Sequence, residues 1–175
     1  MSCRIYMDHA ATTEMLPEVR EAMEPYLREE YGNASTSYDM GVRMHDAIEE
    51  AREKIAWVID AQPEEIFFTS GGSESDNWVI KSVAGEKKNS GKHLITTRIE
   101  HHAVLRSCQY LESLGYEVTY LDVDDYGLVS AKEVVHALRE DTTLVSVMTG
   151  NNEIGTIEPI ADIGAQLRAR GIAFH

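Results

Sequence analysis

The stretch HLITTRIEHHAVLRSCQYLESLGYEVTYL, residues 93–121, decides the fold class of this chain. Its two ends, HLITT and EVTYL, are short apolar runs that predict two strands. Between them Val104, Cys108 and Leu111 form an apolar stripe at helical spacing, which predicts a helix over 101–114. A strand, a helix and a second strand in this order make a right-handed βαβ unit with parallel strands.

The alternation of strands and helices continues on both sides of this unit. Further strands are predicted in IFFTS (66–70), TLVSVM (143–148) and IAF (172–174), and further helices near 74–85, 130–139 and 159–170. The chain is therefore expected to be an α/β protein with a largely parallel sheet and helices on both faces. Ligands of such sheets bind at the carboxyl ends of the strands, so the residues that follow each strand are the candidate site residues.

Two helices are predicted before the sheet begins. The segment LPEVREAMEPYLREEY (16–31) has apolar residues on one helical face, and Pro17 near its start costs no hydrogen bond. Gly32 ends this helix, and the loop-forming stretch GNASTSYDMG follows. A long amphipathic helix is then predicted from the apolar stripe that runs from Met44 to Val58.

Composition and charge exclude several classes of function. The 175 residues carry 16 Lys and Arg against 30 Asp and Glu, a net charge of −14, which repels nucleic acid and anionic membrane surfaces. The longest apolar runs have only the length of a strand, and the N-terminus has no signal-peptide pattern, so we expect a cytoplasmic protein. Cys3 and Cys108 lie far apart without metal-ligand spacing, so neither a metal site nor a disulfide is expected.

The loop TSGGSESDN (69–77), after the first predicted strand, has the features of a phosphate site. Two adjacent glycines let a ligand approach the backbone, and the helix that opens at Ser73 offers free N–H groups and a dipole that favours an anion. The alternative is that Ser73 is only a helix N-cap and the glycines only a tight turn. The glycine spacing matches neither the dinucleotide fingerprint nor the P-loop, so a phosphate bound here would belong to another kind of ligand.

Two more polar loops follow strands at the same edge of the sheet. RIEHHAV places Glu100 and His101 at a junction of strand and helix, where a histidine can stack on a flat ring, transfer a proton, or serve only as a solvated cap. MTGNNEIGT (148–156) places consecutive asparagines in a turn, where their amides bind a ligand or are purely structural. The residues alone therefore predict a small phosphate-bearing ligand at this edge, without naming a reaction.

Seven segments, in order from about residue 5 to residue 175, resemble cysteine desulfurases of the NifS and iron–sulfur assembly branch, within the class V aminotransferase group of pyridoxal phosphate enzymes. The segments are YMDHAATT, YGNAST, EIFFTSGGSESDN, EHHAVL, EVTYLDVDDYGLV, LVSVMTGNNEIGTIEPI and RGIAFH. The resemblance implies the aspartate aminotransferase-like fold of pyridoxal phosphate enzymes of fold type I. It also implies an N-terminal segment (1–13) that lines the active site and an incomplete cofactor-binding large domain (14–175).

The same resemblance assigns roles to individual residues. Gly72 and Ser73 correspond to the positions that hold the cofactor phosphate, and His101 to the catalytic histidine that stacks on the pyridine ring and helps in proton transfer. Asn152 corresponds to the asparagine near the phenolic oxygen of the cofactor and the substrate carboxylate. Asn33, in YGNAST, is assigned with Asn152 to substrate binding.

The activity that the resemblance implies is pyridoxal 5'-phosphate-dependent removal of sulfur from L-cysteine, which gives alanine and a protein persulfide for an iron–sulfur scaffold protein. A homodimer is implied as well. The family's reaction needs a lysine that binds the cofactor and a cysteine that accepts the sulfur, and neither has a match in this chain. No lysine has the sequence context that the family requires. Cys108 lies on an apolar helical stripe, and Cys3 has no base beside it. We therefore expect the chain to be an amino-terminal half that needs a complementary carboxyl-terminal half and is inactive alone.

Two alternatives stay open on the sequence. Another class V activity, such as that of an aminotransferase, would use the same cofactor cradle, because the residues that select the substrate mostly lie in the other half. A non-catalytic scaffold or binding module would keep the sulfur-transfer surface without turnover. Analysis of the product, alanine or a keto acid, distinguishes a desulfurase from an aminotransferase.

Overall fold

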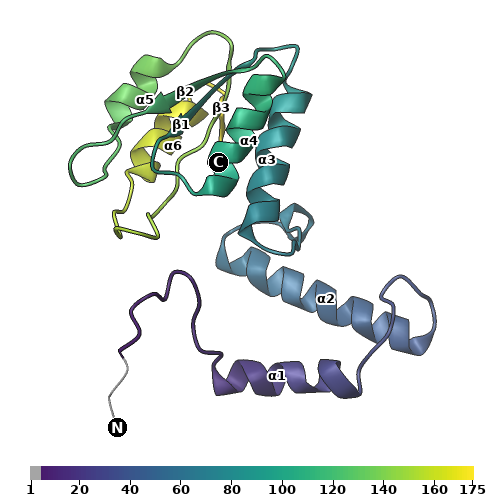
Figure 1. Ribbon diagram of the computed structural model, residues 1–175. Helices are drawn as coiled ribbons and strands as arrows, with labels where there is room; N and C mark the ends of the chain where they lie inside the picture. Colours follow the sequence, from purple (N-terminus) through teal and green to yellow (C-terminus); the bar gives the residue numbers. More distant parts are fainter. Residues whose placement is uncertain (1–4) are drawn as a thin grey trace. The chain divides into compact units, whose positions relative to one another are not determined.

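The chain divides into two compact units, Met1–Phe68 and Thr69–His175, and the computed structural model describes residues 5–175 of it (Figure 1). The first unit contains α1 (Pro17–Arg28), α2 (Asp39–Val58) and the 3₁₀ turn η1 (Pro63–Glu65). The second unit contains all the strands of the described residues. No helix within residues 5–175 is long and apolar enough to cross a membrane.

Both helices predicted for the first unit are confirmed. α1 begins with Pro17 at its first position, where the missing N–H breaks no helical hydrogen bond. α2 includes the whole predicted apolar stripe but begins earlier than Met44. Its first turn contains Met40, four residues before Met44, and an ion pair, 2.9 Å long, between Arg43 and Asp39. The loop-forming composition of GNASTSYDMG led the sequence pattern to place the helix start too late.

The second unit is built on a four-stranded parallel sheet in the order β2-β1-β3-β4. Its strands are β1 (His93–Thr97), β2 (Glu117–Leu121), β3 (Thr142–Val145) and β4 (Ala173–Phe174). The predicted parallel sheet is thereby confirmed, although β3 and β4 are shorter than the apolar runs that predicted them. Because all four strands run in the same direction, their carboxyl ends meet at one edge of the sheet.

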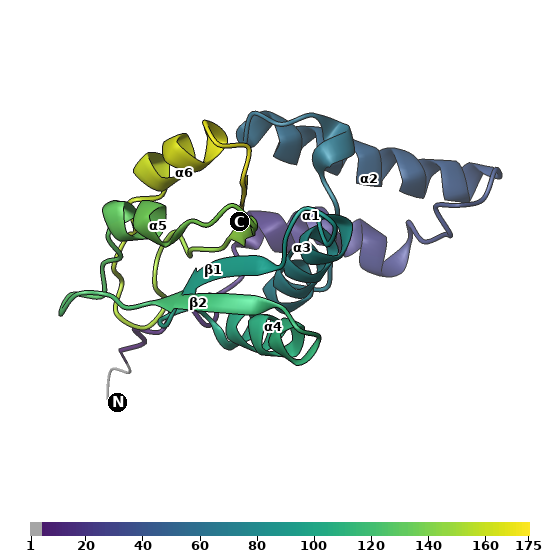
Figure 2. The same ribbon diagram turned by 90° about the horizontal axis from the view of Figure 1, so that it is seen from above.

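Helices cover both faces of this sheet, as predicted. They are α3 (Gly72–Glu86), α4 (His102–Ser113), α5 (Ala131–Ala137) and α6 (Ile160–Arg168). α3 and α4 pack on one face around Leu94 and Leu144, and α5 and α6 pack on the other around Ile95 and Val145. Figures 1 and 2 show the two pairs of helices on opposite sides of the strands. Since successive residues of a strand point to opposite faces, each strand contributes to both cores.

The strand predicted in IFFTS (66–70) is wrong. Within the described part of the chain these residues have no strand pairing, and Phe68 is half exposed. A strand exists only where a neighbouring strand accepts and donates its backbone hydrogen bonds. The apolar run supplied the composition of a strand, but the sheet of the second unit provides no partner for it.

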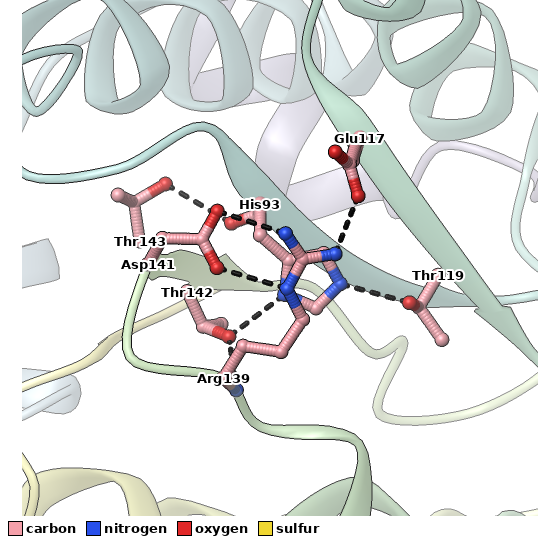
Figure 3. Close-up of polar contacts among 7 residues, drawn as sticks. All are labelled: His93, Glu117, Thr119, Arg139, Asp141, Thr142 and Thr143. Atoms are coloured by element: carbon pink, nitrogen blue, oxygen red, sulfur yellow. Dashed lines mark hydrogen bonds and ion pairs between the residues drawn. The ribbon is translucent and has the colours of Figure 1, made fainter.

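A buried histidine joins three strands at the amino-terminal edge of the sheet (Figure 3). His93 is fully buried, with Nδ1 2.7 Å from the Thr142 hydroxyl and Nε2 2.8 Å from the Thr119 hydroxyl. Thr142 already accepts the backbone N–H of Arg139 at 2.7 Å, so its own proton is free to go to Nδ1. This arrangement suits the neutral imidazole with its proton on Nε2. Burial, and next the nearby Arg139, lower the pKa of His93, which favours the same neutral form.

Candidate active site

A cavity of about 340 Å³ opens at the carboxyl edge of the sheet. Its lining includes Glu100 and His101 after β1, Thr149 after β3, His175 after β4, and Asp76 from α3. Four segments that are far apart in sequence therefore contribute to one site, as expected for the carboxyl edge of a parallel α/β sheet. A hollow of about 690 Å³ in the first unit is mostly apolar, and its Lys54 pairs with Glu50 at 2.6 Å. The polar cavity in the second unit is therefore the better candidate for chemistry.

The glycine-rich loop leads directly into the amino terminus of α3. The N-cap is Gly71, with a φ of 156° that L side chains rarely adopt, and Gly72 and Ser73 are the first two helical residues. The alternative in which Ser73 is the N-cap is therefore wrong. In this first turn the Glu74 N–H bonds the Gly71 carbonyl at 3.1 Å, whereas the N–H groups of Gly72 and Ser73 have no helical carbonyl within reach, and a Cβ at Gly72 would meet only open space. This helix terminus has the donors and the room that a phosphate needs.

His101 is both the cap of a helix and part of the cavity wall. It is the N-cap of α4, and its Nδ1 accepts the backbone N–H of Ala103 at 3.1 Å. That bond leaves Nε2 as the nitrogen available to a ligand, and the ring itself is exposed. His101 therefore is a solvated helix cap, and its free nitrogen and exposed face still leave it able to contact a ligand.

The two asparagines of the loop after β3 differ in their surroundings. Asn152 is exposed, and its amide donates to the Glu153 carboxylate at 3.0 Å. Asn151 is buried, and its side-chain oxygen accepts the backbone N–H groups of Glu153 at 2.8 Å and Ile154 at 3.1 Å. The structural interpretation therefore fits Asn151, whereas Asn152 keeps an accessible amide. The cavity wall as defined above does not include Asn152.

Three polar residues of the cavity were not among the predicted site residues. His175 Nδ1 lies 2.9 Å from the Ser146 hydroxyl, and Nε2 lies 3.6 Å from the Asp76 carboxylate. Ser146 is inside the TLVSVM run, where its neighbours identify only a strand. Asp76 is in the second turn of α3, and only the tertiary structure shows that this turn faces the end of β4. The position of His175 directly after a strand is the one signal that sequence alone offers.

Glu100 is a carboxyl group buried at the edge of the cavity, with 7% of its surface exposed. Burial raises its pKa, and the nearby Asp76 and Glu158 carboxylates act in the same direction. Hydrogen bonds from the Met148 backbone and the Thr97 hydroxyl act the opposite way. The sequence placed Glu100 at this edge, but it could not show that the carboxyl group faces the loop after β3.

The remaining predicted site residue, Asn33, lies in the first unit. Its side-chain oxygen accepts the backbone N–H of Ser35 at 3.0 Å, and its carbonyl accepts that of Thr36 at 3.0 Å. These bonds form a turn before α2 and account for an asparagine at this position. Its role in substrate binding stays a prediction, as does the lining role of residues 1–13.

The thiol of Cys108 is unsuited to nucleophilic chemistry, as expected from its helical stripe. It is free and buried, and burial raises its pKa to about 12. Cys3, the other cysteine, lies outside the described residues. No lysine of the described chain lines the cavity, and no group of His, Cys, Asp and Glu within residues 5–175 could hold a metal ion.

We expect Cys108 in the native chain to resist alkylation. Because the thiolate is the reactive form, iodoacetamide at pH 8 should label Cys108 at least ~100-fold more slowly than in urea-unfolded chain. Mass spectrometry of the tryptic peptide measures the rate, and the fully unfolded chain is the internal control. Rapid labelling without denaturant would contradict the buried position on α4.

Comparison with known proteins agrees with this geometry. The family model for aminotransferase class-V matches residues 5–175. The chain is 53% identical over 171 residues to the cysteine desulfurase IscS of Methanosarcina thermophila and 51% identical over 172 residues to the putative cysteine desulfurase IscS 1 of Bacillus subtilis. Each alignment covers 98% of this chain but only 42% and 45% of the relative, so the chain spans less than half the length of these relatives.

Solved structures give the same result. A structure described as a NifS-like protein superposes with a TM-score of 0.95 at 41% identity, covering 99% of this chain and 48% of that protein. The structure of SspA in complex with cysteine superposes with a TM-score of 0.93 at 42% identity, covering 97% of this chain and 49% of that protein. Proteins of the class V and cysteine desulfurase groups depend on pyridoxal 5'-phosphate, and the fold is that of pyridoxal phosphate enzymes of fold type I. The chain belongs to the class V aminotransferase family.

Proposed function

We propose that this chain forms the amino-terminal portion of a cysteine desulfurase that uses pyridoxal 5'-phosphate to release sulfur from L-cysteine. The observation that carries the proposal is the polar cavity at the carboxyl edge of the sheet, in a fold that superposes at a TM-score of 0.93 on a protein solved with cysteine. The products are alanine and a protein persulfide. An iron–sulfur scaffold protein in the cytoplasm is the proposed sulfur acceptor.

The residues present fit the cofactor. Gly72 and Ser73 offer an open helix terminus to a doubly charged phosphate, His101 offers a flat exposed ring, and Asn152 offers an amide that both donates and accepts. When bound, pyridoxal phosphate supplies an electron sink for bonds at the substrate carbon atoms. The second unit thus provides hydrogen-bond donors for the phosphate and a flat side chain for the cofactor ring, on segments that adjoin the sheet.

Each of these residues has a defined task in the proposed reaction. The first turn of α3 binds the phosphate and fixes the position of the cofactor. His101 Nδ1 is occupied by the Ala103 backbone N–H, so the neutral ring holds its proton at Nε2 and can donate a hydrogen bond in the plane of the ring to the ligand, while its face is free to stack. Asn152 donates a hydrogen bond from its amide to an oxygen of the ligand, which orients the ligand in the site.

Two tasks fall to residues outside this chain. A lysine that holds the cofactor is absent from the cavity wall of the described residues, and Cys108 is buried with a raised pKa. We therefore propose that turnover requires a complementary carboxyl-terminal portion that contributes the lysine and the sulfur-accepting cysteine. The full assembly is proposed to be a homodimer.

Reconstitution tests the proposed function. The chain is mixed with the complementary portion of the Methanosarcina relative in the presence of a thiol reductant, which releases the persulfide sulfur as sulfide. Alanine and sulfide formed from L-cysteine are measured for the mixture and for each part alone. We expect turnover only in the mixture, and we expect His101→Gln to lower kcat by roughly 100-fold, the usual contribution of a positioned acid–base group. Ser113→Ala, on the exposed end of α4, is the matched control and should leave kcat unchanged.

The products decide between the alternatives. A keto acid in place of alanine would assign the chain to an aminotransferase. A folded mixture that binds pyridoxal phosphate but forms neither product from L-cysteine would contradict the proposed function and support a binding module.

A further inference from the structure

The loops that carry His101 and Asn152 hold each other through two buried side chains. One loop follows β1 and the other follows β3, and the two strands are neighbours in the sheet. Glu100 reaches from the first loop to the second, and Asn151 reaches from the second loop to the first. Both residues are more than nine-tenths buried, with 7% and 8% of their surfaces exposed.

Glu100 binds the start of the loop after β3. Its Oε1 accepts the backbone N–H of Met148 at 2.8 Å and the hydroxyl of Thr97 at 3.1 Å. The second bond ties the carboxyl group to the end of its own strand. The first bond crosses to the neighbouring strand, so the direction in which the chain leaves β3 depends on this side chain.

Asn151 makes the reciprocal contact. Its Nδ2 donates to the Ile99 carbonyl at 3.1 Å, while its Oδ1 accepts two backbone N–H groups of its own turn. The side-chain amide therefore has two separate tasks: the oxygen shapes the turn and the nitrogen ties that turn to the loop after β1. Only the second task concerns the relation between the loops.

Each residue of this pair directly precedes a residue of the proposed site. Glu100 precedes His101, and Asn151 precedes Asn152. His101 and Asn152 are themselves exposed, so burial does not fix their positions. We propose that Glu100 and Asn151 form a reciprocal clasp that sets the separation between the His101 ring and the Asn152 amide, and that both are positioning residues for the cofactor ring. The positioning of the cofactor ring rests on the proposed function, whereas the clasp rests only on the hydrogen bonds of Glu100 and Asn151.

Matched variants separate the clasp from local structure. Glu100→Gln keeps an oxygen that can accept the Met148 N–H, and Glu100→Ala removes it. Asn151→Asp keeps the oxygen that shapes the turn but cannot donate to Ile99 at neutral pH, and Asn151→Ala removes both functions. If the clasp holds the loops, Glu100→Gln should behave nearly as the unmodified chain, and the other three should not.

Hydrogen exchange of the whole chain measures the clasp without any ligand. We expect the Met148 amide to exchange roughly tenfold faster in Glu100→Ala, since a hydrogen bond to a carboxyl group contributes about that factor. Asn151→Asp should accelerate exchange at Met148 too, although Asn151 Nδ2 contacts the Ile99 carbonyl and, at 3.4 Å, the Met148 sulfur but not the Met148 amide, because the contacts hold one junction. Effects of Glu100→Ala and Asn151→Ala that are strictly additive at Met148 and Asn152 would overturn the reciprocal clasp.

Ligand binding measures the consequence for the site. Two probes are titrated into each variant: inorganic phosphate, which needs only the first turn of α3, and pyridoxal 5'-phosphate, which also needs the ring contacts. We expect Asn151→Asp to weaken pyridoxal phosphate binding about tenfold and to change phosphate binding by less than about twofold. A variant that was merely unstable would weaken both.

The outcomes distinguish this inference from the proposed function. Equal loss of both ligands in Asn151→Asp, or unchanged binding of both, would overturn the positioning role. If the unmodified chain binds neither probe, the phosphate cradle of the proposed function is contradicted, and hydrogen exchange at Met148 and Asn152 still decides whether the clasp exists.

Discussion

Replacing His93 with alanine is expected to destabilise the second unit by about 3 kcal/mol, as for other large-to-small substitutions of fully buried residues. The imidazole is completely buried and its two nitrogens contact hydroxyls on β2 and β3. Removing it leaves a cavity and takes one hydrogen-bond partner from the buried Thr142 hydroxyl and from the partly buried Thr119 hydroxyl, and both effects weaken the folded state. Urea unfolding followed by circular dichroism, with hydrogen exchange at Ile95 to report on β1, measures the loss.

His93→Gln is the matched variant, because a glutamine amide can donate to one threonine and accept from the other but does not titrate. The pKa of His93 is lowered in the folded chain, by burial first and by Arg139 next, whereas Asp141 and Glu117 act in the opposite direction. The unfolded chain therefore binds a proton more readily, and this histidine's contribution to stability is complete above about pH 6.5 and is lost as the pH falls below it.

We accordingly expect the free energy of unfolding to fall between about pH 6.5 and pH 5 in the unmodified chain and to fall less in His93→Gln. Glu100 has the opposite sign, since its raised pKa makes its contribution largest at low pH and smaller as the pH rises. Its transition starts at the ordinary carboxyl range and extends upward from there, so the comparison with His93→Gln, in which Glu100 is unchanged, isolates the effect of the histidine. Identical pH profiles for the two proteins would show that His93 is not the titrating group.

Alanine at Gly91 is expected to cost about 3 kcal/mol, the upper range for overpacking. A Cβ at this position would overlap the backbone carbonyl of Asp141, and a backbone cannot move aside as a flexible side chain does. Gly91 precedes β1 and Asp141 precedes β3, so relief of the overlap would separate the two central strands where they begin. Urea unfolding of Gly91→Ala measures the cost.

Gly85→Ala is the matched control in the same unit. Gly85 lies within α3, and a Cβ there would meet nothing within 4 Å. Alanine is the better helix former, so this variant is expected to gain about 0.5 kcal/mol. A similar loss in both variants would show that the close approach of Gly91 to Asp141 does not limit the size of the residue.

Local patterns correctly predicted the elements that bury apolar side chains at a regular spacing along the chain. The helical stripe of Val104, Cys108 and Leu111 packs on the sheet as its spacing required, and HLITT and EVTYL became paired strands. IFFTS had the same composition and formed no strand, because pairing depends on a neighbour that composition does not describe. Apolar periodicity therefore predicted where side chains are buried better than it predicted where backbones pair.

The candidate site shows the same division. His101 was found because it directly follows a predicted strand that the structure confirms, and its position at the carboxyl edge follows from the parallel sheet. Gly72 was found from the glycine pair at the start of a helix, although the strand predicted before it does not form. Asp76 and Ser146 lie within a helix and a strand run, where nothing local marks them as polar neighbours of His175. These residues are close to His175 only because of the order of the strands in the sheet, and local sequence patterns do not determine that order.

By itself the sequence determined the α/β class and the parallel direction of the strands and pointed to the loops proposed to bind a ligand, because these follow from residue periodicity and from the handedness of βαβ units. Only the tertiary structure decided that Glu100 and Asn151 face each other's loops and that His93 is held between two threonines. A hydrogen bond depends on distances of a few tenths of an ångström between atoms far apart in the chain, and those distances are set only when the whole sheet has assembled.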